Sequence, residues 1–439
     1  MLKKDLGVFL SKLVNKKIAR ERFVRDHSSH EKDFTRERIL TFPTMFLLLL
    51  RKSVKSLQLI LNELFIHNDI SQVVSSSAYN QARKKFRHTA FIELNEDAIA
   101  LFYEKAKIKR WKGYSVHGVD ASQVILPKTQ ELEDKFGSIP IKNTHMESRY
   151  VSALFECRYD VLNHMVVQCS LHSGSSYEVD LAIKLLQESP KRTEKELDIY
   201  DRGYASYEFL SQLTYHQRQF VIRMPSNSFK ATKDLFSGAR QWSKVVCLKA
   251  PKDRVTTLKE QGLPTEISVR FVSVLLDTGE IEVLATSLIN EVISRKEFKE
   301  LYFLRWGVEG FFNLVKGRLN LENFTGKSLE SIYQDFWSTI FITNAETVFT
   351  YETENELNDS LAKECLPQKI NKAVSFNAIK NMAFELFFNE GNAEKAYEKL
   401  SILFRTGTIV QRTDRSPPRE KTSARKSLNY QKRSRKHVF

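Results

Sequence analysis

The spacing of apolar residues divides the chain into a helical part and a part rich in strands. Over residues 37–110, apolar side chains recur at intervals of three and four, which predicts helices. The most apolar run is FPTMFLLLL (42–50), and Arg51 and Lys52 follow it directly. A membrane-spanning helix needs about 20 apolar residues. We therefore expect a buried helix at 42–50 and no membrane partner.

From residue 113 onwards, short apolar runs typical of strands alternate with helical segments. Such alternation predicts an α/β fold. Two of the runs, 113–120 and 195–201, each end in an aspartate, Asp120 and Asp201. The other expected strands are two runs around a turn at 160–164, and residues 218–224.

The segment 241–290 interrupts this alternation. Its runs are strand-like, with Asp277-Thr278-Gly279 as a hairpin turn, so we expect an all-β insertion at about 225–290. Ser294 and Glu297 then match a capping box, which predicts one long helix from about 295 through 316. Residues 330–404 again have a helical pattern.

Four regions follow from these patterns. They are a helical region (1–110), an α/β region (111–345), a helical C-terminal region (346–404) and a basic tail expected to be disordered (405–439).

The charge of the chain favours polyanionic partners. The 439 residues carry a formal charge of +15, with a pI near 9.4. Residues 405–439 hold 11 Lys/Arg and 2 Asp/Glu, a net +9, which suits contact with a phosphate backbone, although a solubilising tail explains it too. The four cysteines have no CxxC spacing, which argues against a disulfide framework and indicates a reducing cytoplasm.

Residues 67–88 are a candidate DNA-reading motif. Asn68-Asp69 predicts a turn, and two short helices follow, the second of which ends in basic residues that include Arg83 and Lys84. A helix-turn-helix would present these side chains to a DNA groove. A solvated basic helix face accounts for the stretch equally well.

The stretch YFLRWGVEGFFNLVKG (302–317) combines charges and glycines on an apolar helix. On a helical wheel, Tyr302, Arg305, Glu309 and Lys316 share one face within about 60°. Glycines 310 and 317 lie beside that face, where a missing side chain would let a large ligand approach. An ordinary polar stripe with an Arg305–Glu309 pair is the alternative.

Asp120, Asp201 and Glu309 together suggest a metal site. Carboxylates at strand ends gather at the functional edge of an α/β sheet. Three hard oxygen ligands suit Mg²⁺ or Mn²⁺. Two such ions about 4 Å apart can promote phosphodiester cleavage. No glycine-rich phosphate loop is present, which argues against an enzyme that uses ATP or NAD.

These residues resemble a known family. The spacing of Tyr302, Arg305, Glu309 and Lys316 reproduces the Tyr-Arg-Glu-Lys signature of one group of bacterial insertion-sequence DDE transposases, the insertion-sequence-four type. VDASQVILP around Asp120 and DRGY from Asp201 resemble that family's two aspartate motifs. The resemblance covers roughly residues 37–345.

The resemblance implies a ribonuclease H-like core interrupted by the insertion, and cut-and-paste transposition. Asp120, Asp201 and Glu309 would be catalytic and would hold two Mg²⁺ or Mn²⁺ ions. Tyr302, Arg305 and Lys316 would contact DNA. The partners would be double-stranded DNA, comprising terminal inverted repeats and target DNA, and a second copy in a homodimer. The protein would be cytoplasmic in a bacterium and associated with the nucleoid when bound to DNA.

Two alternatives stay open. A nuclease of the same fold would cut DNA without strand transfer. A non-catalytic DNA-binding derivative would keep the fold alone, although the presence of all three acids speaks against it.

Overall fold

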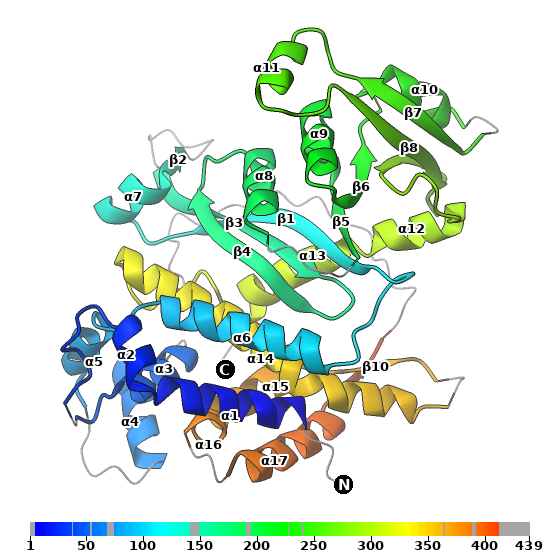
Figure 1. Ribbon diagram of the computed structural model, residues 1–439. Helices are drawn as coiled ribbons and strands as arrows, with labels where there is room; N and C mark the ends of the chain where they lie inside the picture. Colours follow the sequence, from blue (N-terminus) through cyan, green and yellow to red (C-terminus); the bar gives the residue numbers. More distant parts are fainter. Residues whose placement is uncertain are drawn as a thin grey trace.

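A nine-stranded mixed sheet forms the centre of the molecule, with helices on both faces (Figure 1). The computed structural model describes residues 5–36, 38–52, 55–67, 74–140, 149–189, 195–226, 228–238, 241–362, 365–388 and 392–411. The strands lie in the order β2-β3-β1-β5-β6-β9-β8-β7, with β4 also paired to β3. Their bounds are β1 Ser115–Ile125, β2 Ser138–Pro140, β3 Arg149–Asp160, β4 Met165–Ser173, β5 Glu196–Tyr200, β6 Gln219–Met224, β7 Ser243–Lys249, β8 Glu266–Leu275 and β9 Ile281–Thr286.

Only the centre of the sheet is parallel. β5 pairs in parallel with β1 and with β6, and the other described pairs of this sheet are antiparallel. Parallel neighbours need a crossover, which helices supply here. The helices between β1 and β6 are α7 Gln130–Phe136, α8 Glu178–Glu188, η1 Arg202–Tyr204 and α9 Tyr207–Tyr215.

The N-terminal and C-terminal helices form a layer below the sheet in Figure 1. The N-terminal members are α1 Leu6–Ile18, α2 Glu21–Asp26, α3 Phe42–Leu50, α4 Leu57–His67, α5 Ser76–Arg83 and α6 Thr89–Lys105. The C-terminal members are α14 Leu329–Asp359, α15 Lys372–Asn381, α16 Ala383–Phe387 and α17 Ala393–Thr406, with β10 Gln368–Ile370 paired to β11 Thr408–Val410. In the described part of the chain, no helix is both long enough and apolar enough to cross a bilayer.

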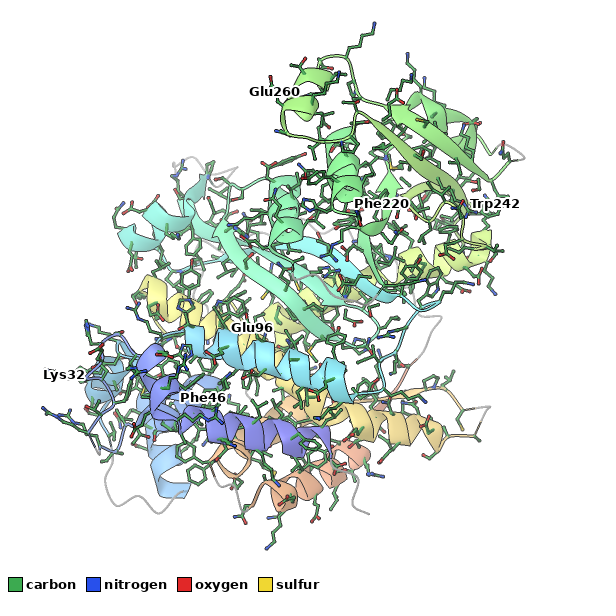
Figure 2. All side chains as sticks on the ribbon, viewed as in Figure 1. Lys32, Phe46, Glu96, Phe220, Trp242 and Glu260 are labelled. Atoms are coloured by element: carbon green, nitrogen blue, oxygen red, sulfur yellow. The ribbon has the colours of Figure 1, made fainter. Side chains whose placement is uncertain are left out.

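The N-terminal and C-terminal helices share one hydrophobic core, although the sequence pattern separated them into two regions. α14, which is 31 residues long, runs through this core. Phe46, labelled in Figure 2, lies with its ring centroid 5.2 Å from that of Phe91 and 5.8 Å from that of Phe341. Asn344 of α14 also hydrogen-bonds both backbone groups of Val166 in β4, which ties the helical layer to the sheet.

The expectation of an all-β insertion is wrong in part. Between β6 and β9 the chain forms β7 and β8, and also η2 Lys230–Thr232, α10 Lys233–Phe236 and α11 Val255–Glu260. Leu235 and Leu258 of these helices are buried in the core that includes β8 and β9. β9 pairs with β6, so the insertion extends the main sheet. The expected hairpin turn is present, with Gly279 at φ 82° between β8 and β9.

The long helix expected at 295–316 is also divided. The capping box of Ser294 and Glu297 begins α12 (Arg295–Phe303) as predicted. The amide of Arg305 then bonds to the carbonyl of Tyr302, three residues back, and a new helix α13 runs from Trp306 to Asn313. A π-helical turn, η3, continues from Leu314 to Arg318. A uniform helical wheel therefore does not describe this stretch.

Two glycines of α13 differ in their surroundings. A Cβ atom on Gly307 would lie 3.0 Å from Val161 Cγ1, whereas one on Gly310 would meet no atom within 4 Å. We expect Gly310→Ala to raise the free energy of unfolding by up to about 1 kcal/mol, because alanine favours helix. Gly307→Ala should lower it by about 1 kcal/mol through overpacking. Urea unfolding of both variants checks this, and equal effects would contradict it.

Candidate active site

The register of the parallel pair brings the two aspartates level. β1 and β5 pair Ser115 with Glu196 and Gly118 with Ile199. Continued two residues further along both strands, the same register places Asp120 opposite Asp201. β1 itself continues past this point to Ile125, so Asp120 lies within a strand and not at its end. Asp201 does follow the last residue of β5.

Alternation along β1 directs Asp120 towards α13. Even-numbered neighbours on the strand face that helix, because Gly118 lies where a Cβ would be 3.1 Å from Val308 Cβ. Ser122, on the other side of Asp120, accepts a hydrogen bond from Lys316 Nζ at 2.7 Å. Side chains two residues apart share a face of a strand. Asp120 therefore lies under α13 and η3.

The environment of Asp120 disfavours the charged form of its carboxylate. Its side chain is 21 % exposed, and its Oδ1 accepts a hydrogen bond from the Ala121 amide at 2.8 Å. Burial raises the pKa of Asp120 to about 7, and the negative charges of Glu178 and Glu309 add to the rise. The Ala121 amide and the Arg305 guanidinium oppose it without cancelling it. A cation beside Asp120 would stabilise the charged carboxylate and lower its pKa again.

Asp201 is held at the start of a short 3-10 turn. Its Oδ1 accepts a hydrogen bond from the amide of Arg202 at 2.7 Å, which caps η1. The residue is partly exposed. Tyr204, the last residue of the turn, is buried against Tyr200 and Phe209, and this packing anchors the DRGY segment.

Glu309 and Asp120 are joined through Arg305. The Arg305 guanidinium is 2.8 Å from Glu309 Oε1 and 4.0 Å from Asp120 Oδ2, measured from Nη2 and Nη1 respectively. Arg305 is only 4 % exposed, and its charge also interacts with Asp201. Arg305 thus interacts with all three of the predicted acids. The Arg305–Glu309 contact expected under the alternative interpretation, an ordinary polar stripe, is present, and it belongs to a larger charge cluster.

Tyr302 and Arg305 keep buried polar atoms without partners in the described part of the chain. These atoms are the Tyr302 hydroxyl and Arg305 Nε. The Arg305 guanidinium also lies over the Trp306 ring, 4.8 Å from its centroid. An unsatisfied buried donor costs about 1–3 kcal/mol. Both atoms would gain from an acceptor such as a phosphate oxygen.

Lys316 lies at the far end of the same face. Besides Ser122, its Nζ donates a hydrogen bond to the Gln123 carbonyl on β1. The π-helical turn η3 carries Lys316 over the strand end. The four signature residues predicted on one helix face therefore come from three helical pieces. Arg305 and Glu309 lie near Asp120, the charges of Asp201 and Arg305 act on Tyr302, and Lys316 lies over Ser122 and Gln123 of β1.

Arg83 is not an exposed side chain that could reach into a DNA groove, which corrects the sequence prediction. It is 5 % exposed, and its Nη2 is 2.8 Å from Asp335 Oδ1. Its remaining donors bond to Thr325, Ser331 and Gln334, so the side chain ties α5 to α14. Lys84, the next residue, is exposed.

The predicted helix-turn-helix is described only in part. Its second helix is present as α5, which begins at Ser76. Residues 68–73, which include the expected turn and the beginning of the first helix, lie outside the described residues, as do residues 412–439 of the basic tail.

The sequence reasoning missed two acids near the site, Glu178 and Glu282. Glu178 begins α8, and burial followed by the charge of Asp201 raises its pKa. Glu282 of β9 is 8 % exposed, pairs with Arg223 at 2.9 Å and also has a raised pKa, chiefly through burial. No motif marked either residue, because their proximity depends on which strands and helices adjoin β5.

The carboxylate oxygens of Asp120, Asp201 and Glu309 are ligands of the kind that a hard divalent cation prefers, although they do not form a complete binding site in this structure. Carboxylates on β1, at the end of β5 and on α13 interact with the Arg305 guanidinium, and burial disfavours the negative charge of Asp120. Among the described residues, however, no three acidic, histidine or cysteine side chains lie close enough to share one ion. The Arg305 guanidinium takes the place of a counter-charge between Asp120 and Glu309. Metal binding would therefore require Arg305 to move.

The strain on Asp120 predicts a pH-dependent stability. Because its pKa is about 7 in the folded protein and near 3.8 when unfolded, the folded state holds an extra proton between these values. Stability should therefore fall as pH rises from about 4 to 7. Asp120→Asn should remove this loss and gain up to about 4 kcal/mol at pH 8 in EDTA. Urea unfolding across pH measures it, with Asp253→Asn as an exposed control. Parallel profiles for Asp120→Asn and wild type would contradict the prediction.

The fold and the site define a mixed α/β protein with an acidic centre on adjacent parallel strands. Residues 111–345 match the family described as "Transposase DDE domain", and the chain belongs to that family. The match spans Asp120, Asp201 and Glu309. No curated protein matches the chain. Among solved structures, the chain is similar to a piggyBac transposase synaptic complex with hairpin DNA, with 11 % identity, a TM-score of 0.46, and coverage of 91 % of this chain and 85 % of that one.

Proposed function

We propose that this chain is a transposase that cuts DNA at transposon ends and transfers the freed strand to target DNA. The observation that carries the proposal is the placement of Arg305 between Asp120 and Glu309, next to the β1–β5 register that brings Asp201 level with Asp120. Family membership supports the same reading. The core is then a ribonuclease H-like fold, and the chain a member of the Tyr-Arg-Glu-Lys group.

The acids would hold Mg²⁺ or Mn²⁺, two ions in the full assembly. Bound metal supplies Lewis acidity towards the scissile phosphate and activates the attacking oxygen. Asp120 offers a carboxylate that releases its proton easily when a cation approaches, because burial holds its pKa near 7. Glu309, in the first turn of α13, presents its carboxylate from a helix packed on β1.

The other signature residues would bind and orient DNA. The Tyr302 hydroxyl and Arg305 Nε lack partners in the described structure and are suited to phosphate oxygens. Arg305 would exchange Glu309 for a phosphate as DNA enters, which frees the carboxylates. The open space beside Gly310 leaves room for a DNA strand. Lys84 and the N-terminal helices would contribute further contacts.

The partner in this proposal is double-stranded DNA, with terminal inverted repeats and target DNA bound by a homodimer. A labelled duplex carrying the element's own end tests it, with Mg²⁺ or EDTA present. Metal-dependent nicking followed by a joined product supports a transposase. Nicking without joining supports the nuclease alternative, and metal-independent binding without nicking supports the non-catalytic one.

A further inference from the structure

A second positively charged site lies away from the acidic centre, in a cavity between the N-terminal helices and the segment 319–328. Its volume is about 200 Å³. Five of its fourteen lining residues are cationic and none is acidic. We call it the cationic pocket, and its charged lining residues are Arg51, Lys52, Lys55, Arg83 and Lys327.

Two of the five cations already have carboxylate partners. Arg83 pairs with Asp335, and Lys55 pairs with Glu63 at 2.7 Å. Arg51, Lys52 and Lys327 make no ion pair within the described part of the chain, and Glu63 and Glu385 act on Arg51 only at longer range. The pocket therefore carries an excess of positive charge that its own walls do not neutralise.

Lys52 is one of the three cations of the pocket without an ion pair in the described part of the chain. Its Nζ donates a hydrogen bond to the Leu321 carbonyl at 3.0 Å and lies 5.3 Å from the centroid of the Phe324 ring. Burial lowers the pKa of Lys52 to about 8; the charge of Asp335 opposes this decrease, and the charge of Arg83 adds to it.

A lysine on the neighbouring helix α15 lies in the same positive environment. Burial lowers the pKa of Lys380 to about 7, and repulsion from Arg51, Lys55 and Lys52 contributes. Its Nζ donates to the Lys52 carbonyl, so the ammonium group is held against the pocket wall. An anion in the cavity would stabilise all of these cations at once, and the apolar walls around it would strengthen the attraction.

The position of the pocket indicates where such an anion comes from. The segment 319–328 leaves η3, which carries Lys316, and forms one wall of the pocket. Along it, the Glu322 carboxylate accepts a hydrogen bond from the Ile125 amide at 3.0 Å, at the end of β1. One segment thus borders both the outer end of the acidic site and the pocket.

We propose that the cationic pocket binds a phosphate group, and that this phosphate belongs to the backbone of DNA that leaves the acidic site past Lys316. Several lysine and arginine donors around a small cavity suit a tetrahedral anion. Only the source of the phosphate rests on the proposed function. The binding of phosphate itself does not.

The first test uses inorganic phosphate and the full chain. The melting temperature of the wild type should rise in phosphate relative to chloride at equal ionic strength, because a ligand of the folded state stabilises it. The double variant Arg51→Gln/Lys327→Gln should lose this rise. Lys395→Gln/Lys399→Gln, on the exposed face of α17, is the matched control and should keep it. Lys52→Met is a second variant that retains apolar packing on Phe324, and it should lose the rise too.

The second test measures duplex affinity against salt concentration, without divalent metal. The slope of log K against log salt is negative, and each lost phosphate contact makes it shallower by about 0.9. We expect a decrease of about 1 for the pocket variant and none for the control. A phosphate-dependent rise in melting temperature with an unchanged slope would assign the pocket to a free phosphate-bearing ligand and overturn the DNA assignment. No rise in the wild type and no change in slope would overturn the pocket altogether. Neither readout needs cleavage, so failure of the proposed chemistry is distinguishable.

Discussion

Replacing Glu309 with glutamine should abolish metal-dependent cutting and leave DNA binding nearly unchanged. Glutamine keeps the shape and the hydrogen bond from Arg305, but it removes the charge that a hard cation requires. Loss of one member of a catalytic group that acts as a unit costs on the order of 10⁴ in rate. The measurement is nicking of an end duplex in Mg²⁺, alongside a gel-shift assay of the same duplex.

Glu300→Gln provides the matched control, because it makes the same chemical change on the adjacent α12. Glu300 is exposed, and its ion pair among the described residues is with Lys296, at 3.8 Å. It should cut at the wild-type rate. Full cutting by Glu309→Gln would remove Glu309 from the metal site. Loss of binding together with cutting would instead assign it a role in DNA recognition.

Replacing Arg83 with methionine should destabilise the protein by about 3–5 kcal/mol. Asp335, which is 1 % exposed, would be left as an uncompensated buried charge. Arg83 also bonds to the Ser331 carbonyl and to Gln334, so the link between α5 and α14 would weaken. Urea unfolding monitored by circular dichroism measures the change.

Two further variants separate the ion pair from other effects. Arg83→Met/Asp335→Leu should recover part of the lost stability, because no buried charge then remains. Arg22→Met, which breaks the exposed pair with Asp26, should change stability by less than about 1 kcal/mol. Unchanged stability in Arg83→Met with weaker DNA binding would restore the original assignment of Arg83 to a DNA surface.

Several local features could be predicted from the sequence because they depend on nearby residues. The capping box of Ser294, the turn at Gly279 and the buried helix at 42–50 are present where expected. Each depends on interactions within a few positions of the chain or on a run of apolar residues. The pair of Arg305 and Glu309 is of the same kind, since four residues span one helical turn.

Other features depended on contacts between distant segments. The charge on Arg83 looked like a surface feature because Asp335 lies 252 residues away in the chain. The insertion contains helices because Leu235 and Leu258 find a core on β8 and β9. The break before α13 lies next to Gly307, which packs closely on Val161, and local helix propensity does not include such a contact.

The sequence by itself determined the chemical inventory of this protein: three acids, a cationic and aromatic helix beside them, and a strongly basic chain. Residue types and short spacings are sufficient for that, because they decide which groups are available. Only the tertiary structure decided that Asp120 and Asp201 share one level of the sheet, that Arg305 lies between the acids, and that Lys52 lines a cationic pocket. Strand register and burial decide such placements, and both arise from contacts across the whole chain.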